Sequence, residues 1–181
     1  MYQHKKYLGM FACLFIFNVS NSRAQEQQAP QEDIASIALA VVMPQSIEGL
    51  SDGNVARLGT KMAAILTNNG VASVDEDQTF IIYPKFEIVD VKETAATLKK
   101  ITVANCNLSL FIQQTSTKVI FASFTKTVIG SGFSRTEAIS NAVSQISAGD
   151  AGITKFIARG KEKIVLYYQQ NCAQFIKKAD L

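Results

Sequence analysis

The sequence predicts an α+β fold of two layers, in which helices cover one face of an antiparallel meander and the elements follow in the order β-α-β-β-β-α-α. Three successive segments between residues 80 and 129 alternate apolar and polar side chains, as strands with one covered face do. One segment before them and two after them carry apolar residues at helical spacing. Of the 181 residues, 48% are hydrophobic and 18% are charged, which is sufficient for one globular core.

Residues 1–24 have the features of a secretory signal peptide. Lys5 and Lys6 precede an apolar run over residues 8–17, and Ser22-Arg23-Ala24 places small residues at −3 and −1. The run is shorter than the roughly 20 residues that a membrane-spanning helix needs. We therefore expect cleavage after Ala24 and a periplasmic or extracellular protein. Cys13 lies inside the apolar run rather than after it, so a lipid anchor is not expected.

The rest of the chain divides into a short linker and a single domain. Residues 25–33 are polar, rich in Gln and contain a proline, which predicts a disordered linker. Residues 34–181 form the predicted α+β domain. No later segment is apolar enough to span a membrane.

Charge and histidine content exclude several functions for the exported part. Three of the 18 basic residues and none of the 15 acidic residues lie in 1–24, so the remainder is balanced in charge and nucleic acid is not an expected partner. The one histidine, His4, also lies in this leader. Catalysis that depends on imidazole and most zinc sites are therefore excluded, and we expect neither a metal nor a cofactor.

The first two elements are a short strand and a helix. The apolar run over residues 37–42 ends at Met43-Pro44 and predicts a strand that is buried on both faces or in the sheet interior. A stripe of apolar residues then predicts a helix over 52–69, which Asn69-Gly70 ends.

The meander follows. Residues 80–88 alternate, but Pro84 removes one ladder donor, which favours an edge strand or a bulge. Residues 101–113 and 119–129 alternate in the same way, and the segment between them, Thr115-Ser116-Thr117, predicts a turn. In the last strand we expect Ile120, Ala122, Phe124 and Val128 to face the helices.

Two helices complete the domain. Ser134 and Glu137 have capping-box spacing and begin a helix that runs to residue 146. After a break at 147–150, a long helix carries one apolar stripe, formed by Ile153, Phe156, Ile157, Ile164, Tyr168, Cys172 and Phe175.

The two cysteines after the leader form a possible disulfide. Cys106 points to the covered face of its strand and Cys172 lies on the apolar stripe of the last helix, so both are expected at the seam between sheet and helices. Oxidising compartments allow such a bond to persist. The alternative is two free thiols that pack as small apolar side chains.

The segment Gly130-Ser131-Gly132 enters a helix and resembles anion-binding turns, but it lacks a phosphate-binding lysine and the full dinucleotide pattern. The favoured interpretation is a turn between a strand and a capped helix. The acidic residues sit at caps, in turns or on polar strand positions, and no catalytic residue is assigned.

The uncovered sheet face is the remaining candidate site. Its aromatic side chains lie among small polar ones, a composition that suits contact with another macromolecule. The alternative is an ordinary solvated sheet face. The residues that we assign to this partner-binding face are Tyr83, Asn107, Phe111 and Phe121.

Several segments carry a resemblance, namely Phe80 to Phe86, Ile101 to Val103, Leu108 to Phe111, Val119 to Phe121, Gly130 to Gly132 and Glu137 to Ala142. Together they resemble secreted Bacteroidota proteins of unknown function, over nearly all of the mature chain. More remotely, the strand, the Gly-x-Gly turn and the following helix are similar to small α/β domains of envelope assembly proteins. These include the curli secretion lipoprotein, lipoprotein activators of penicillin-binding proteins and a flagellar basal-body accessory protein. The resemblance implies binding or assembly, and it carries over no catalytic residue.

These observations lead us to expect a non-enzymatic, exported envelope module whose partner is an envelope protein or peptidoglycan. Two alternatives stay open. A hydrolase that uses carboxylates or a Ser-Lys pair needs a concave site with convergent polar groups, and a carrier of a small ligand or lipid needs a cavity between the layers.

Overall fold

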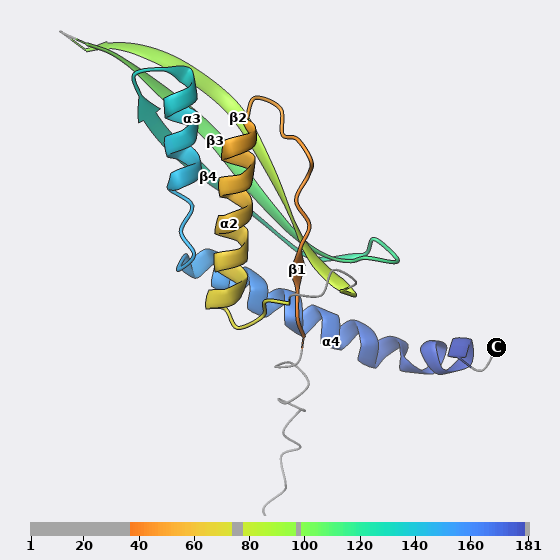
Figure 1. Cartoon of the computed structure of the whole chain (residues 1–181). Helices are drawn as coiled ribbons and strands as arrows, with labels where there is room; N and C mark the ends of the chain where they lie inside the picture. Colours follow the sequence, from red (N-terminus) through yellow and green to blue (C-terminus); the bar gives the residue numbers. More distant parts are fainter. Residues whose placement is uncertain (1–36, 74–77, 97–98, 180–181) are drawn as a thin grey trace, which may run out of the picture.

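The computed structural model describes residues 37–73, 78–96 and 99–179, and its elements follow the predicted order. The predicted signal peptide and linker lie outside the described residues. The elements are β1 (Ala40–Val41), α2 (Asp52–Asn68), β2 (Phe80–Ala96), β3 (Lys99–Gln114), β4 (Ile120–Gly132), α3 (Arg135–Ser144) and α4 (Ala151–Ala179) (Figure 1). The α+β fold class is confirmed.

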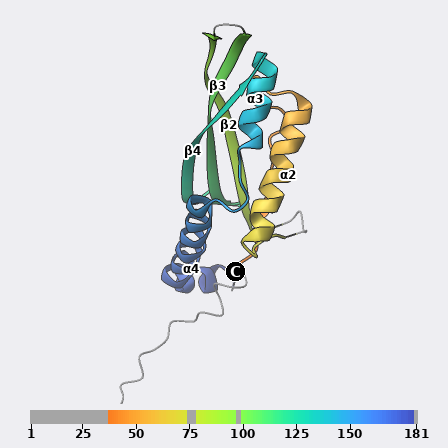
Figure 2. The same cartoon turned by 90° about the vertical axis from the view of Figure 1, so that its left-hand side faces the viewer.

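The sheet has the strand order β1-β2-β3-β4. β2, β3 and β4 are antiparallel neighbours, as the meander predicts, whereas β1 runs parallel to β2. α2 and α3 lie side by side on one face of the sheet, and α4 crosses near one end (Figure 2). A Cβ built on Gly160 of α4 would lie 2.4 Å from Ile112 Cδ1, so α4 packs closely on this same face.

The core lies between the sheet and these helices. On β3 every second residue faces it, and each of these residues is fully buried: Ala104, Cys106, Leu108, Leu110 and Ile112. The helices meet them with Leu58, Met62 and Ile65 of α2, Ala138 and Ala142 of α3, and Phe156 of α4. Burial of one such leucine or isoleucine side chain contributes about 1.5–3 kcal/mol.

The first strand is shorter than predicted and lies at the edge of the sheet, so its predicted interior position is wrong. β1 pairs only through Ala40 and Val41, opposite Ile81 and Ile82. Of the apolar run that suggested an interior strand, only Leu39 and Ala40 are buried, and Val42 is 41% exposed. Leu39 packs into the core and exchanges backbone hydrogen bonds with the segment that follows α2, from Leu39 N–H to Val71 O (2.8 Å) and from Ser73 N–H to Leu39 O (3.0 Å).

β2 is flanked on both sides at its start and becomes an edge strand before Pro84. Since β1 pairs with β2 only as far as Ile82, the proline needs no ladder donor on that side. Pro84 itself is in regular register opposite Leu110; a bulge lies further along, where the register shifts between Ile88 and Asp90 and leaves Val89 61% exposed. Beyond it, β2 and β3 continue as a hairpin that projects past α3 (Figure 1).

The sequence Gly130-Ser131-Gly132 ends β4 and allows α3 to pack closely on the sheet. A Cβ on Gly130 would lie 2.1 Å from the backbone O of Ala138 and N of Ala142, which is impossible without displacing the helix. The capping pattern is confirmed, since Ser134 Oγ accepts from Glu137 N–H (3.2 Å). The Glu137 carboxylate accepts from Phe133 N–H (2.8 Å). The packing interpretation of these glycines is therefore favoured over an anion-binding turn.

α4 begins at a cap formed by Asp150. Its Oδ1 accepts from Gly152 N–H (2.8 Å) and Ile153 N–H (3.1 Å), and its Oδ2 accepts from Lys126 Nζ of β4. The Lys126 ammonium lowers the pKa of the Asp150 carboxyl, with help from the two backbone donors. This carboxylate therefore joins the start of α4 to the edge strand of the sheet.

Candidate functional site

The open sheet face, defined as the side of β2, β3 and β4 that points away from the described helices, carries rows of residues aligned by the strand register. Tyr83, Phe111 and Ser123 form one row across the three strands. Tyr83 and Phe111 are half-buried and Ser123 is exposed. Directly opposite side chains on neighbouring strands lie about 4.5–5.5 Å apart at Cβ, so Tyr83 and Phe111 occupy adjacent positions on the face.

Beside the aromatic row, small polar side chains are bonded to one another across the strands. Ser109 and Thr125 share a hydrogen bond between their hydroxyls (2.9 Å), and Thr127 Oγ1 donates to Asn107 Oδ1 (2.9 Å). These bonds hold the four side chains in defined positions on the open face. Asn107 thus lies on the predicted face, but part of its hydrogen-bonding capacity is already used.

The charged groups of the open face are paired locally. Lys85 Nζ lies 2.8 Å from Glu87 Oε1, and Lys92 Nζ lies 2.8 Å from Asp90 Oδ2. The hydrogen bond to Glu87 raises the pKa of Lys85, and the hydrogen bond to Asp90 does the same for Lys92. The face therefore presents matched charges rather than a field of one sign.

Phe121 does not belong to the open face, so this part of the prediction is wrong. The register between β3 and β4 shifts between Ile112 and Gln113, which opposes Ile120 to Gln113 and Ala122 to Ile112. The extra residue, Phe121, turns to the helix side, is 5% exposed and contacts the ring of Tyr167 edge to face at 5.5 Å. Ile120, predicted to face the helices, is instead 55% exposed.

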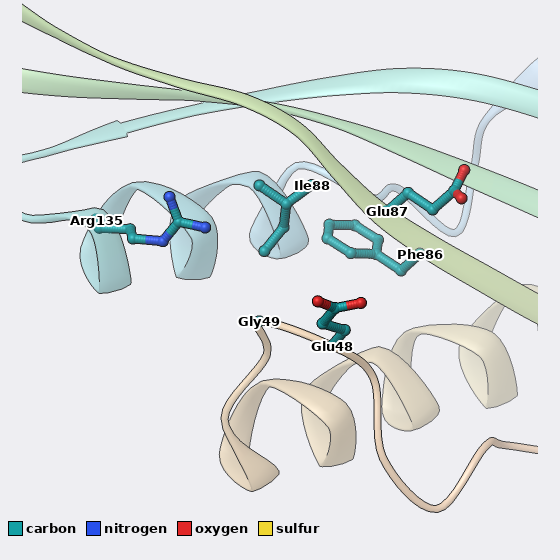
Figure 3. Close-up of a pocket in the computed structure, with 6 residues that line it drawn as sticks. All are labelled: Glu48, Gly49, Phe86, Glu87, Ile88 and Arg135. Atoms are coloured by element: carbon teal, nitrogen blue, oxygen red, sulfur yellow. The ribbon is translucent and has the colours of Figure 1, made fainter.

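A second candidate site is a pocket of about 490 Å³ where the loop before α2, strand β2 and the start of α3 meet (Figure 3). Its lining residues are Glu48, Gly49, Phe86, Glu87, Ile88 and Arg135. Phe86 and Ile88 form an apolar floor, and the carboxylate of Glu48 and the guanidinium of Arg135 are directed toward it from different elements (Figure 3). The Glu87 carboxylate points away, toward its partner Lys85.

Gly49 brings the loop onto the pocket floor. Its φ of +77° is a left-handed conformation that favours glycine, and a Cβ there would lie 2.6 Å from Ile88 Cδ1. Any side chain at this position would push the loop away from β2. The position of Glu48 therefore depends on the glycine that follows it.

Sequence reasoning missed this pocket. Glu48 and Arg135 are far apart in the chain and stand in segments without a recognisable motif. The capping box did place Arg135 at a helix start, and Gly49 was the one local signal for a tight approach in the loop. Neither indicates that the loop and the helix start converge on Ile88.

Both cysteines are free thiols in the structure, and only one of them lies at the predicted seam. Cys106 is fully buried among the core residues of β3, and burial raises the pKa of its thiol. Cys172 is exposed on the last part of α4. The apolar stripe of α4 is buried from Ile153 to Ile164, but further along the helix Tyr168 is only half-buried. The stripe therefore continues beyond the sheet that would cover it.

Two further findings concern metals and membranes. Within the described residues, no group of three or more His, Cys, Asp or Glu side chains is arranged to hold a metal ion. The helices of the described ranges contain no stretch that is both long and apolar enough to cross a bilayer.

Comparisons with known proteins give no family for this chain. No family model and no curated protein matches it. Among solved structures, a minor lipoprotein from Acinetobacter baumannii is similar with 17% identity and a TM-score of 0.39, covering 70% of this chain and 91% of that one. The PelC dodecamer from Paraburkholderia phytofirmans gives 16% identity and a TM-score of 0.43, covering 69% and 88%. At these scores the similarities carry no argument about function.

Proposed function

We propose that this chain is a non-enzymatic, exported module of the bacterial cell envelope that binds a partner protein through its open sheet face. The observation that carries the proposal is the contrast between the two sides of one sheet. The described helices all pack on one side, while the other side presents Tyr83 and Phe111 next to each other in an otherwise small and polar surface.

The composition of the open face supports protein binding. Aromatic residues are enriched at protein interfaces because a rigid ring buries a large area at a small entropic cost. The side chains around the rings are held by Ser109–Thr125 and Asn107–Thr127 hydrogen bonds, so little further ordering is needed on binding. The matched lysine–glutamate and lysine–aspartate pairs favour a partner surface without strong charge.

The polar groups of the two sites support a role without catalysis. A glycosidase-type mechanism needs two carboxylates that face each other across a substrate. The pocket has the Glu48 carboxylate opposite a guanidinium, and Glu87 is directed elsewhere toward Lys85. After the leader the sequence has no histidine to act as a base.

The predicted signal peptide supports export, and export supports an envelope partner. The experiment is affinity capture from envelope extracts with mature wild-type protein, Tyr83→Ser and Phe111→Ser. We expect each substitution to weaken capture of the same protein by about tenfold or more, because aromatic residues at an interface centre carry much of its binding energy.

The matched control is Leu166→Ser, which removes an exposed apolar side chain from α4, where Leu166 is 51% exposed. This variant should capture the partner as the wild type does. Equal capture by all four proteins would overturn the proposal, and so would cosedimentation with purified peptidoglycan that the two open-face substitutions abolish.

A further inference from the structure

The pocket beside Ile88 has the arrangement of groups that a zwitterion needs. Three separate segments build it: the loop before α2 gives Glu48 and Gly49, β2 gives the apolar floor, and the first residue of α3 gives Arg135. One end of the pocket is anionic, the other is cationic, and the surface between them is apolar (Figure 3).

Neither of these two charged side chains has an ion-pair partner among the described residues. Within the described part of the chain, no acidic group lies within ion-pair distance of Arg135, and no basic group lies that close to Glu48. Both side chains are exposed, so a ligand can reach each charge. In Figure 3 the side chain of Ile88 lies between the Arg135 guanidinium and the Glu48 carboxylate, and the ring of Phe86 lies beside the carboxylate.

Part of the pocket floor is apolar. Phe86 is 3% exposed, so the partly buried Ile88 provides the apolar contact for a small aliphatic group. A volume of about 490 Å³ falls within the usual range for small-molecule sites, about 300–1,000 Å³. A lone inorganic anion would leave the Glu48 carboxylate unmatched, and a lone cation would face Arg135.

We propose that this pocket binds a short apolar peptide through its free ends, with the peptide ammonium at Glu48, its carboxylate at Arg135 and an aliphatic side chain on Ile88. Arginine suits this role, because its guanidinium can donate two parallel hydrogen bonds to one carboxylate. The inference is independent of the open sheet face, since the residues of the pocket floor point to the opposite side of β2.

The test uses calorimetric titration of the mature protein with leucylleucine, free leucine, N-acetyl-leucylleucine and leucylleucinamide. Leucylleucine should bind, and each blocked peptide should bind about tenfold or more weakly, since a hydrogen bond to a charged group contributes about 1.5–3 kcal/mol. Free leucine carries the same two charged groups, so its affinity shows whether the pocket prefers a single amino acid or a peptide. Tighter binding of leucine than of the dipeptide would overturn the assignment to a peptide.

Two substitutions assign each charge to its end of the ligand. Glu48→Gln should weaken leucylleucine about tenfold but should not weaken the acetylated peptide further, and Arg135→Gln should give the same pattern with the amide. Glu162→Gln and Arg159→Gln on the exposed side of α4 are the matched controls and should bind leucylleucine as the wild type does. Chemical-shift changes at the Gly49 amide should accompany binding.

Absence of heat at millimolar peptide, equal binding of the blocked peptides, or equal effects of the control substitutions would each overturn the inference. Its failure is distinguishable from failure of the proposed function. Tyr83→Ser should leave leucylleucine binding unchanged, and Glu48→Gln should leave capture of the envelope partner unchanged.

Discussion

The two faces of strand β3 differ in burial, although their residues alternate in one continuous sequence. Leu108 and Leu110 are fully buried beneath the helices, whereas Ser109 and Phe111, their direct neighbours in the chain, are half-buried on the open face. Alternation alone creates this difference, because successive side chains of a strand point to opposite sides. The covered face supplies the buried apolar residues of the core, and the open face is the one that we propose for binding.

The largest expected effect tests the covered face. Leu110→Ala should lower the free energy of unfolding by about 3 kcal/mol, because the substitution removes buried methyl groups and leaves a cavity between the sheet and the helices. Urea unfolding monitored by circular dichroism measures it.

The matched substitution on the open face is Ser109→Ala, one residue away. It removes an exposed hydroxyl–hydroxyl bond and should change the free energy of unfolding by no more than about 0.5 kcal/mol. Similar losses for both variants would mean that the open face is covered in solution and that the contrast between the faces does not hold.

A smaller effect tests how α4 is attached to the covered face. Asp150→Ala removes the helix cap and the partner of Lys126, and it should lower the free energy of unfolding by about 1 kcal/mol. Asp150→Asn keeps a side-chain oxygen at the cap and should cost less. Thermal unfolding of the two variants and the wild type separates the contribution of the cap hydrogen bonds from that of the charge opposite Lys126.

The pH dependence of the same pair has a definite sign. Since the folded protein lowers the pKa of Asp150, the stabilisation is present above the ordinary carboxyl pKa of about 3.9 and is lost as the pH falls through the folded value. The stability difference between wild type and Asp150→Asn should therefore be constant near neutrality and shrink in acid. A difference that grows as the pH falls would contradict the role assigned to the charge.

Periodicity predicted the helices, the side of each β3 residue and the strands, except that β2 continues from the predicted end at residue 88 to Ala96. The errors occur where one residue is inserted into a ladder. The bulge that includes Phe121 reverses the faces at the start of β4, and alternation cannot indicate it, because an aromatic residue suits either side. β1 was misplaced for a related reason, since an apolar run does not show whether a strand or the loop residues around it account for the burial.

The candidate sites were predictable to different degrees. The positions of Tyr83, Asn107 and Phe111 on one sheet face could be predicted, because the alternation of a strand encodes which side each residue faces. The pocket brings together Glu48 and Arg135 through the packing of a loop and a helix on Ile88, and no local pattern records that approach. Its one precondition visible in the sequence is Gly49, whose left-handed backbone is shown only by the structure.

The smallest expected effect is that of a reducing agent on stability, which depends on whether Cys106 of the covered face is bonded to Cys172. The structure places Cys106 inside the covered face and Cys172 in an exposed position, both as free thiols, so a reducing agent should leave the unfolding midpoint unchanged. A bond between them would close a loop of about 66 residues and contribute roughly 4 kcal/mol, and reduction would then lower the midpoint by many degrees.

Thiol labelling distinguishes free from bonded cysteines by their rates of reaction. Cys172 should react with a water-soluble maleimide in the native protein, whereas Cys106 should react only on unfolding, because it is inaccessible and its raised pKa keeps the thiol protonated.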